Sequence, residues 1–244
     1  MLARGLSDIA AMGGRPRWAL LSLCLPDWVT ATWKKHFFNG LFDLAGTTGV
    51  ALIGGDLAHG ESLTADIVVL GECRRGRALR RSTAKTGDSI YVSGLLGGAA
   101  LGLERLRAGR TRPSDQAVRR HLCPTPRLAL GQYLSRHPGV RAALDLSDGL
   151  SIDLFRLTQE SGVGAEIRAA DLPVFPGATL DQALHGGEDY ELLFTISPGR
   201  PLPASAGGVR LTPIGVITPG KKLVLVGADG RRRTMPVKGF EHDL

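Results

Sequence analysis

Cysteine is scarce in this chain of 244 residues, which contains only Cys24, Cys73 and Cys123. The number is odd, the spacing is wide and no Cys-x-x-Cys pair occurs. A disulfide-rich scaffold is therefore excluded, and a zinc site is not indicated. We expect each cysteine to be a small buried hydrophobic residue in a protein kept in a reducing compartment.

Signals for nucleophilic catalysis and for membrane insertion are also lacking. The histidines form no His-Glu-x-x-His pattern and no Gly-x-Ser-x-Gly elbow occurs, so neither a zinc protease nor a hydrolase triad is indicated. The apolar run from Trp18 to Leu25 is too short to cross a bilayer and is closed by Pro26. The N-terminus shows no signal-peptide pattern, so we expect a cytoplasmic protein with no membrane partner.

The formal net charge of +7 arises mostly from an excess of arginine. One arginine cluster lies within residues 74–81 and another spans Arg231 to Arg233. A basic surface attracts phosphorylated ligands or nucleic acid, but no nucleic-acid-binding motif accompanies these clusters. Because Arg231 directly follows the turn signal Asp229-Gly230, we interpret the second cluster as a solvated turn and expect no nucleic-acid partner.

Hydrophobic residues make up 43% of the chain, enough for a substantial core, and the 33 glycines indicate many tight turns. A basic stretch over residues 71–87 is poor in large apolar residues and is the expected domain boundary. Beyond it, strands alternate with helices, apart from a charged connector over 109–123, so we predict a layered α+β or α/β fold. Before the boundary, hydrophobic periodicity predicts a helix over 2–12, a strand over 17–25, a helix over 29–48 and strands over 50–53 and 63–70.

Acidic residues beside glycine recur at three places. Asp145 and Asp148 stand where a predicted strand is followed by a helix, Asp56 follows a Gly-Gly pair at the end of another predicted strand, and an acidic run spans Glu188 to Glu191. The carboxyl ends of strands in α/β sheets bind ligands, paired carboxylates hold hard cations, and helix N-termini favour phosphate. These motifs indicate a metal–nucleotide site.

A structural explanation of each motif stays open at this point. Ser147 or Asp148 could simply cap the following helix. The three acids of the run from Glu188 to Glu191 need a metal, basic groups of a substrate or solvent as partners, because unpaired carboxylates near a core are costly.

The motifs occur in an order that resembles the thiamine-monophosphate kinase family, within the aminoimidazole ribonucleotide synthetase superfamily. The resemblance covers essentially the whole chain and rests on Ser7–Gly13, Ile53–Asp56, Ala78–Ser82, Asp145–Leu150, Gly186–Leu192 and Gly239–His242. It implies a two-domain aminoimidazole ribonucleotide synthetase-like fold. A truncated α+β domain over residues 1–76 would serve ATP binding, Mg²⁺ binding and dimerisation, and a complete α/β domain would span 77–244.

The resemblance also implies an activity and its residues. ATP would donate its γ-phosphate directly to thiamine monophosphate, giving thiamine diphosphate and ADP, with several Mg²⁺ ions, no covalent nucleophile and a homodimeric enzyme. The implied Mg²⁺ ligands are Asp8, Asp56, Asp145 and Asp148. The implied ATP contacts are Gly55, Asp56, Arg81 and Ser147. Glu188 and Phe240 would contact the thiamine moiety, whose cationic ring suits a carboxylate and an aromatic face.

One departure from the family pattern bears on activity. Family members begin with a segment that carries a Gly-Asp-Asp motif and a Val-Glu-Gly-Val-His-Phe motif, and this sequence starts after both. Either the start is misassigned or the sequence is a fragment, and we favour a misassigned start because the remaining motifs are intact. We expect the 244-residue form to have an incomplete metal site, an unpaired sheet edge and little kinase activity by itself.

Two other hypotheses remain at this stage. The chain could be another ATP-using member of the same superfamily, such as a selenophosphate synthetase or a hydrogenase-maturation protein, although Cys24 lies in a predicted apolar strand rather than in a reactive setting. It could also be a non-catalytic nucleotide-binding protein, which the intact acidic motifs disfavour.

Overall fold

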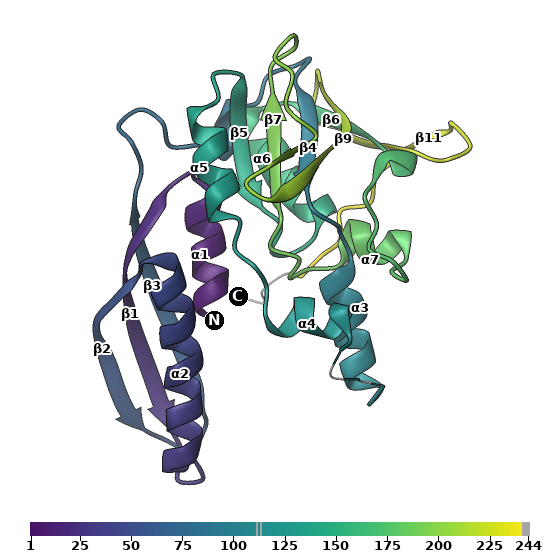
Figure 1. The fold of residues 1–244 in the computed structure, drawn as a ribbon. Helices are drawn as coiled ribbons and strands as arrows, with labels where there is room; N and C mark the ends of the chain where they lie inside the picture. The colour runs from purple at the N-terminus through teal and green to yellow at the C-terminus, as the bar shows by residue number, and fades with distance from the viewer. Residues whose placement is uncertain (111, 113, 241–244) are drawn as a thin grey trace.

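A computed structural model describes residues 1–110, 112 and 114–240, which form two sheet-based units (Figure 1). Glu241 and His242, the end of the last motif, lie outside the described residues. The elements of the first unit are α1 (Leu2–Ala11), β1 (Arg15–Leu25), α2 (Ala31–Thr48), β2 (Ala51–His59) and β3 (Thr64–Glu72). This order of helix, strand, helix, strand, strand agrees with the periodicity of the sequence.

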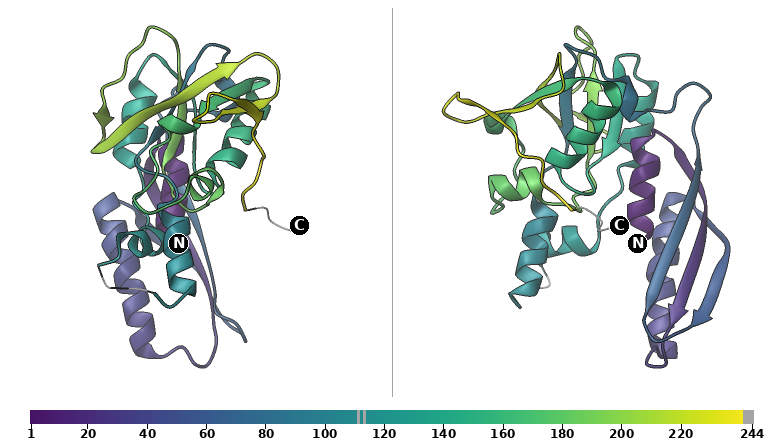
Figure 2. Two further views of the ribbon diagram at one scale, coloured as in Figure 1. Left: turned by 90° about the vertical axis from the view of Figure 1, so that its right-hand side faces the viewer. Right: turned by 180° about the vertical axis from the view of Figure 1, so that it is seen from behind.

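The first unit is a three-stranded sheet with two helices on one face. Strand β1 is central, parallel to β2 and antiparallel to β3. Its alternate residues Ala19, Leu21 and Leu23 are buried, as expected for a strand with one covered face. They pack against Leu6 of α1 and Leu41 of α2, and Figure 2 shows α2 lying along this face. Burying a leucine side chain contributes about 1.5–3 kcal/mol, so this cluster stabilises the unit.

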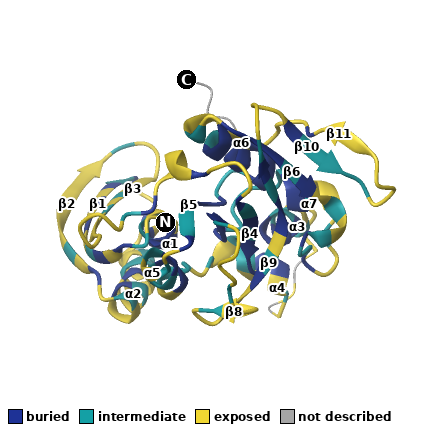
Figure 3. Cartoon of the chain, turned by 90° about the horizontal axis from the view of Figure 1, so that it is seen from above, coloured by how far each residue is buried: buried dark blue, intermediate teal, exposed yellow. Residues whose placement is uncertain are grey.

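The opposite face of the same sheet is apolar and exposed. Trp18, Leu20, Val68 and Leu70 remain between 36% and 48% exposed. The register places Trp18 beside Leu70 and Leu20 beside Val68, so the four side chains form one continuous patch, called here the outer sheet face. Strands β2 and β3 are the edges of this sheet, and most of their residues are exposed (Figure 3).

Among the described residues, the second unit contains an eight-stranded sheet in the order β11-β10-β6-β9-β4-β7-β5, with β8 paired to β9. In chain order its elements are η1 (Arg81–Thr83), β4 (Ser89–Ser93), α3 (Gly98–Arg107), α4 (Gln116–Leu122), α5 (Leu128–Arg136), β5 (Val140–Asp145), α6 (Leu150–Ser161), β6 (Gly164–Arg168), η2 (Ala169–Asp171), α7 (Leu180–His185), β7 (Leu192–Ile196), β8 (Ser205–Ala206), β9 (Val209–Thr218), β10 (Leu223–Val226) and β11 (Arg232–Thr234).

Helices cover both faces of this sheet, and strand β7 shows the division. Leu193 belongs to a core cluster with Leu150, Leu154 and Leu157 of α6. Its neighbour Phe194 points the other way, into a second cluster with residues of α1 and α5. Because successive side chains of a strand face opposite sides, β7 is buried on both.

Helix α1 joins the two units, since it packs against α5 and β5 as well as against β3. The approach to α5 is close: a Cβ on Gly131 would collide with the carbonyl oxygen of Ala10. Glycine at position 131 therefore lets α1 lie directly on α5. This packing brings the middle of α1 to the end of β5.

Several expectations differ from the structure. The segment expected to be a connector contains α4, whose N-cap Asp115 accepts hydrogen bonds from the backbone N–H groups of Ala117 and Val118. The segment is rich in arginine and the short helix buries only Ala117 and Val118, so there is little hydrophobic periodicity from which to predict it. Strand β2 continues through Asp56 to His59, so Asp56 lies within a strand rather than at its end.

The cysteines are free, but they are less buried than expected. Cys73 and Cys123 are exposed and Cys24 is half-buried. In the part of the chain that the structure describes, no helix is long and apolar enough to cross a membrane.

Candidate active site

The turn between β5 and α6 is not built by a side-chain cap of the kind considered from the sequence. Gly149 is the N-cap residue, with a φ of 123°, and it makes no capping side-chain bond. Instead, the buried carboxylate of Asp153 accepts hydrogen bonds from the backbone N–H groups of Asp148 and Gly149, both at 3.1 Å. The cap explanation for Ser147 and Asp148 is therefore wrong, and both side chains are left for other contacts.

Asp145, the last residue of β5, lies close to Asp8 of α1. Burial and the charge of Asp8 raise the pKa of Asp145 to about 7. Burial also raises the pKa of Asp8, and the charge of Arg81 opposes that rise. The structure thus brings together three predicted site residues, two carboxylates and one guanidinium, from α1, β5 and η1.

The side chain of Ser7 is fully buried beside this pair of acids. Its hydroxyl partly offsets the raised pKa of Asp145. No hydrogen bond of normal geometry to Ser7 Oγ exists within the described residues, however. An unsatisfied buried hydroxyl beside two repelling carboxylates is the arrangement expected around a site that takes a cation.

Asp148 is held differently, because Arg156 of α6 lies against it. The Arg156 guanidinium donates to Asp148 at 2.5 Å and to Asp153 at 2.9 Å. Asp148 therefore already has a positive partner, whereas Asp145 has none recorded among the described residues.

The acidic run after Gly187 is hydrogen-bonded to the turn at Leu146 and Ser147. The N–H of Glu188 donates to Ser147 O at 2.7 Å, and the N–H of Tyr190 donates to Leu146 O at 2.9 Å. Glu188 and Tyr190 have φ values of 68° and 49°, a left-handed conformation that costs a non-glycine residue about 1–3 kcal/mol. Strain of this size held by backbone hydrogen bonds is typical of functional sites.

The three acids of this run all have protein partners: Glu188 contacts Arg4 and His121, and the other two accept hydrogen bonds from neighbouring groups. Asp189 accepts from the N–H groups of Gly97 and Ala99 at the start of α3, at 2.5 and 3.1 Å. Glu191 is fully buried and accepts from Arg127 at 2.5 and 2.8 Å and from Ser93 at 2.5 Å. The expectation that a metal, substrate or solvent must meet all three acids is therefore wrong for this pair. Glu188 alone faces a cleft.

This cleft has a volume of about 1140 Å³. Ser147, Asp148, Glu188 and Phe240 line it, so predicted residues from three separate motifs border one space. Burial and the charges of Glu188, Asp145 and Asp148 raise the pKa of Tyr190 to about 12, although Arg4 opposes this. Tyr190 thus lies between the acids of the turn and the cleft.

The segment that carries Phe240 is fastened to α6. Ser151 Oγ donates to Lys238 O at 2.6 Å and contacts His185 Nδ1 at 2.7 Å. The N–H of Phe240 donates to Asp148 O at 3.2 Å. Ser151 and His185, with Asp181 at 4.0 Å, superficially resemble a hydrolase triad, but this serine hydroxyl is buried and is used to hold the C-terminal segment.

Gly55 and Asp56 stand apart from this group, on the exposed strand β2. A Cβ on Gly55 would overlap the backbone of Leu21 in β1, so glycine is required there by the close strand packing. No cluster of three or more His, Cys, Asp or Glu residues suited to a metal occurs in the described ranges, so Asp56 does not join Asp8 and Asp145 in this structure.

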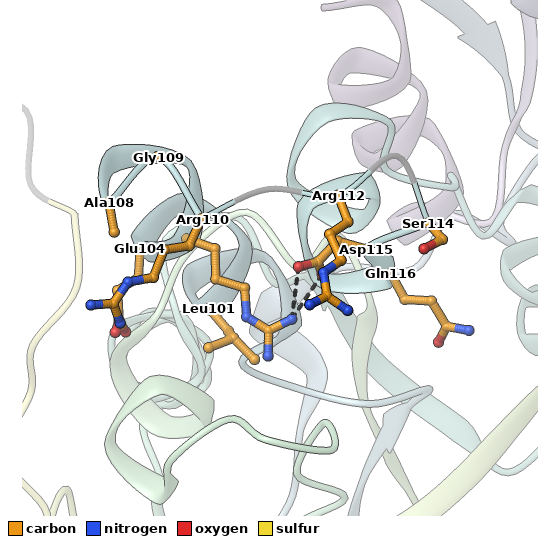
Figure 4. A pocket seen from close by; sticks show the side chains of 10 residues that line it. Leu101, Glu104, Ala108, Gly109, Arg110, Arg112, Ser114, Asp115 and Gln116 are labelled. Atoms are coloured by element: carbon orange, nitrogen blue, oxygen red, sulfur yellow. Dashed lines mark hydrogen bonds and ion pairs between the residues drawn. The ribbon is translucent and has the colours of Figure 1, made fainter.

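A second hollow, of about 860 Å³, lies between α3 and α4 (Figure 4). Arg105 donates to both carboxylate oxygens of Asp115, at 2.8 and 2.9 Å. Because Asp115 is also the N-cap of α4, this bidentate pair fixes α4 against α3.

The site is completed by residues that were not predicted as site residues: Arg4, Ser7, His121, Asp153 and Tyr190. Arg4 and His121 both contact Glu188. The useful signal would have been proximity to a motif, since Ser7 precedes Asp8 and Tyr190 lies inside the acidic run. His121 offered no such signal because it lies in the helix that sequence patterns missed.

Comparison with known proteins first defines the class. The family description "AIR synthase related protein, N-terminal domain" matches residues 1–73, and "AIR synthase related protein, C-terminal domain" matches residues 85–228. The two-domain fold implied by the resemblance is thereby confirmed. The hydrogenase maturation protein HypE in complex with ATP, 16% identical with a TM-score of 0.82 over 99% of this chain and 78% of that chain, shares the fold.

The closer similarities define the family. The chain is 41% identical to thiamine-monophosphate kinase of Escherichia coli K12 over 99% of its own length and 78% of the relative's, and 35% identical to that of Bacillus subtilis over 99% and 79%. Crystal structures agree: thiamine-monophosphate kinase from Stenotrophomonas maltophilia has a TM-score of 0.86 at 38% identity over 94% of this chain and 77% of that one. The structure described as AaThiL complexed with AMPPCP and TMP has 0.87 at 32% over 98% and 80%. The chain belongs to the thiamine-monophosphate kinase family.

Proposed function

We propose that this chain transfers the γ-phosphate of ATP to the phosphate of thiamine monophosphate. An oxygen of the acceptor phosphate forms a bond to the γ-phosphorus while the bond to the bridging β–γ oxygen breaks, giving thiamine diphosphate and ADP. The observation that carries this proposal is the cleft in which Glu188 and Phe240 stand beside the turn from Asp145 to Asp148. Transfer between two polyanions requires positioning and neutralisation of charge, and the site offers both without a protein nucleophile.

Mg²⁺ is proposed as the ion held by Asp8 and Asp145, with Asp148 as a further ligand. Buried Asp145 and the more exposed Asp8 repel one another, and the buried hydroxyl of Ser7 beside them has no hydrogen bond of normal geometry among the described residues, which fits a hard cation with oxygen ligands. When bound, Mg²⁺ supplies neutralisation of phosphate charge. Arg156 contacts only Oδ2 of Asp148, so Oδ1 is proposed to face the ion, and Asp56 is proposed on its motif alone.

For the nucleotide, we propose that Arg81 pairs with phosphate and that Ser147, Gly55 and Asp56 contact ATP. The effect of Arg81 on Asp8 puts a positive group next to the carboxylate pair, where phosphates and cations would meet. Glu188 and Phe240 are proposed to hold the acceptor, the carboxylate facing its cationic and amino groups and the ring packing against it.

The domain division and the assembly are part of the proposal. Residues 1–76 would form a truncated N-terminal unit for ATP, Mg²⁺ and dimer contacts, and residues 77–244 the C-terminal aminoimidazole ribonucleotide synthetase-like domain, which adds further ATP and Mg²⁺ contacts and the residues for the acceptor. The outer sheet face, with Trp18, Leu20, Val68 and Leu70 exposed, is proposed to pack against a second copy of the chain. Leu20→Glu should then shift sedimentation from dimer to monomer. Use of ATP and three free cysteines support a cytoplasmic location.

The test is formation of ADP that depends on both Mg²⁺ and thiamine monophosphate, measured on this chain and on any longer form that its reading frame supports. Glu188→Gln should raise the KM for thiamine monophosphate roughly tenfold, the cost of about 1.4 kcal/mol for one charged contact, with little change for ATP. Glu160→Gln, an exposed change on α6, is the control. Phosphorylation of thiamine itself, with thiamine monophosphate left untouched, would refute the acceptor assignment.

A further inference from the structure

Glu188 has its side chain held on two sides, although it lies in an open cleft. Its Oε1 lies 2.5 Å from the guanidinium of Arg4, and its Oε2 lies 2.9 Å from Nδ1 of His121. Arg4 comes from α1 in the first unit and His121 from α4 in the second. The backbone adds a third restraint, since the N–H of Glu188 donates to Ser147 O.

The two basic partners differ in how firmly they are held. The side chain of Arg4 is 53% exposed, whereas that of His121 is 15% exposed. The Arg4 side chain is long and lies in the first turn of α1; among the described residues its guanidinium contacts Glu188 and lies 6.0 Å from the centre of the Tyr190 ring. An exposed ion pair of this kind is worth about 0–1 kcal/mol, so it is readily exchanged.

His121 is fixed by the helix that carries it. Helix α4 is fastened at its start by the Arg105–Asp115 pair and near its end by Arg120, which donates to Leu95 O at 3.0 Å and lies over the ring of Phe175 at 5.2 Å. Whether the imidazole is neutral or protonated, Nδ1 can carry the hydrogen that it donates to the carboxylate. His121 is thus a firmly held hydrogen-bond donor to Glu188, whereas Arg4 is an exposed and easily displaced ion-pair partner of the same carboxylate.

We propose that His121 is a positioning residue that aims the Glu188 carboxylate into the cleft, and that Arg4 is a stand-in which the cationic part of the phosphate acceptor displaces. This inference rests on the proposed function and adds two residues to its specificity. It requires that substitution of His121 and substitution of Arg4 have opposite effects on binding of the acceptor. Loss of His121 lets the Glu188 side chain turn away from the cleft, whereas loss of Arg4 removes a competitor for Oε1 of Glu188.

The experiment is calorimetric titration of thiamine monophosphate into the protein in the presence of a non-hydrolysable ATP analogue and Mg²⁺. His121→Ala should weaken binding roughly tenfold, as expected for loss of a charge-assisted hydrogen bond, while the Kd of the ATP analogue stays the same. His121→Asn should restore most of the affinity, because its amide can donate from near the position of Nδ1. Arg4→Gln should bind the acceptor more tightly than wild type, by a few-fold.

Matched controls exist in the first unit, at positions away from the cleft. His59 lies 2.8 Å from Asp27, and Arg17 lies 3.4 Å from Glu72, so His59→Ala and Arg17→Ala remove the same kinds of pair away from the cleft. Neither should change acceptor binding. If His121→Ala fails to fold, His121→Phe keeps the ring volume without the donor and should show the same weakening.

Three results would overturn the inference while leaving the proposed function intact: an unchanged acceptor Kd in the folded His121 variants, failure of His121→Asn to restore binding, or a loss in Arg4→Gln as large as in His121→Ala. Failure of the wild-type protein to bind thiamine monophosphate at all would instead refute the proposed function, and this inference with it.

Discussion

Asp145→Asn is expected to stabilise the metal-free protein, and added Mg²⁺ should reduce that advantage over the wild type. The change keeps the size of the side chain and removes its charge. Burial and the charge of Asp8 raise the pKa of Asp145 from 3.8 to about 7. One pKa unit corresponds to about 1.4 kcal/mol, so the ionised carboxylate costs the folded protein at most roughly 4 kcal/mol.

The direction with pH follows from proton binding. Between pH 3.8 and about 7 the folded wild type holds a proton on Asp145 that the unfolded chain has lost. The free energy of unfolding therefore decreases as the pH rises through this window and levels off above it. Asparagine does not titrate, so the advantage of Asp145→Asn should be small at about pH 4 and greatest above pH 7.

Added Mg²⁺ should narrow the difference at high pH. An ion at 100 times its Kd stabilises the folded state by about 2.7 kcal/mol, and the variant should gain less because it lacks a ligand. The assay is urea unfolding at about pH 5 and pH 8, with EDTA or with Mg²⁺. Asp66→Asn, an exposed change on β3, is the control. A variant less stable than wild type at pH 8 in EDTA would refute the account of Asp145.

Three further outcomes are expected. Burial raises the pKa of Asp189 to about 6, so Asp189→Asn should gain stability over wild type as the pH rises from about 4 to 7 in thermal unfolding, and a pH-independent difference would contradict this. Gly55→Ala should destabilise far more than Gly54→Ala, because only the former places a Cβ against backbone of β1; equal urea midpoints would count against the packing described. Arg127→Ala should cost less than the about 3–5 kcal/mol of a fully unpaired buried charge, because Arg120 still lies 3.5 Å from Glu191, and Glu191→Gln should recover part of that loss; a change below 1 kcal/mol in urea unfolding would argue against the pair.

The sequence was most informative where periodicity is strong. The apolar stripes of α1 and α2 and the buried run of β7 decide their elements locally, so these were predictable. Helix α4 was not, because its formation depends on Asp115 as a cap and on α3 as a surface to pack against. A charged seven-residue segment gives little signal of either.

The acidic residues of the site could be predicted from the sequence, but the residues that contact them could not. Asp145, Asp148 and Glu188 follow from their motifs, but the sequence could not say that Asp153 holds the turn or that Arg127 takes Glu191. The pairing of Arg127 with Glu191 joins residues distant in the chain and is set by the docking of elements, whereas Asp153 is close in sequence and acts through the local shape of the turn. Asp189 and Glu191 looked like Glu188 for the same reason: a carboxylate's role depends on what faces it.

The contact of α1 with β5 has a consequence for the order in which the protein is made. The two acids it brings together belong to the start and the middle of the chain, so the ribosome releases Asp8 long before Asp145 exists. Neither half alone presents the pair. A cation held between them therefore binds only chains in which both units have folded and docked, and it slows their separation. Mg²⁺ should accordingly protect the connection over residues 73–80 from proteolysis, so that ligand binding also monitors completed assembly.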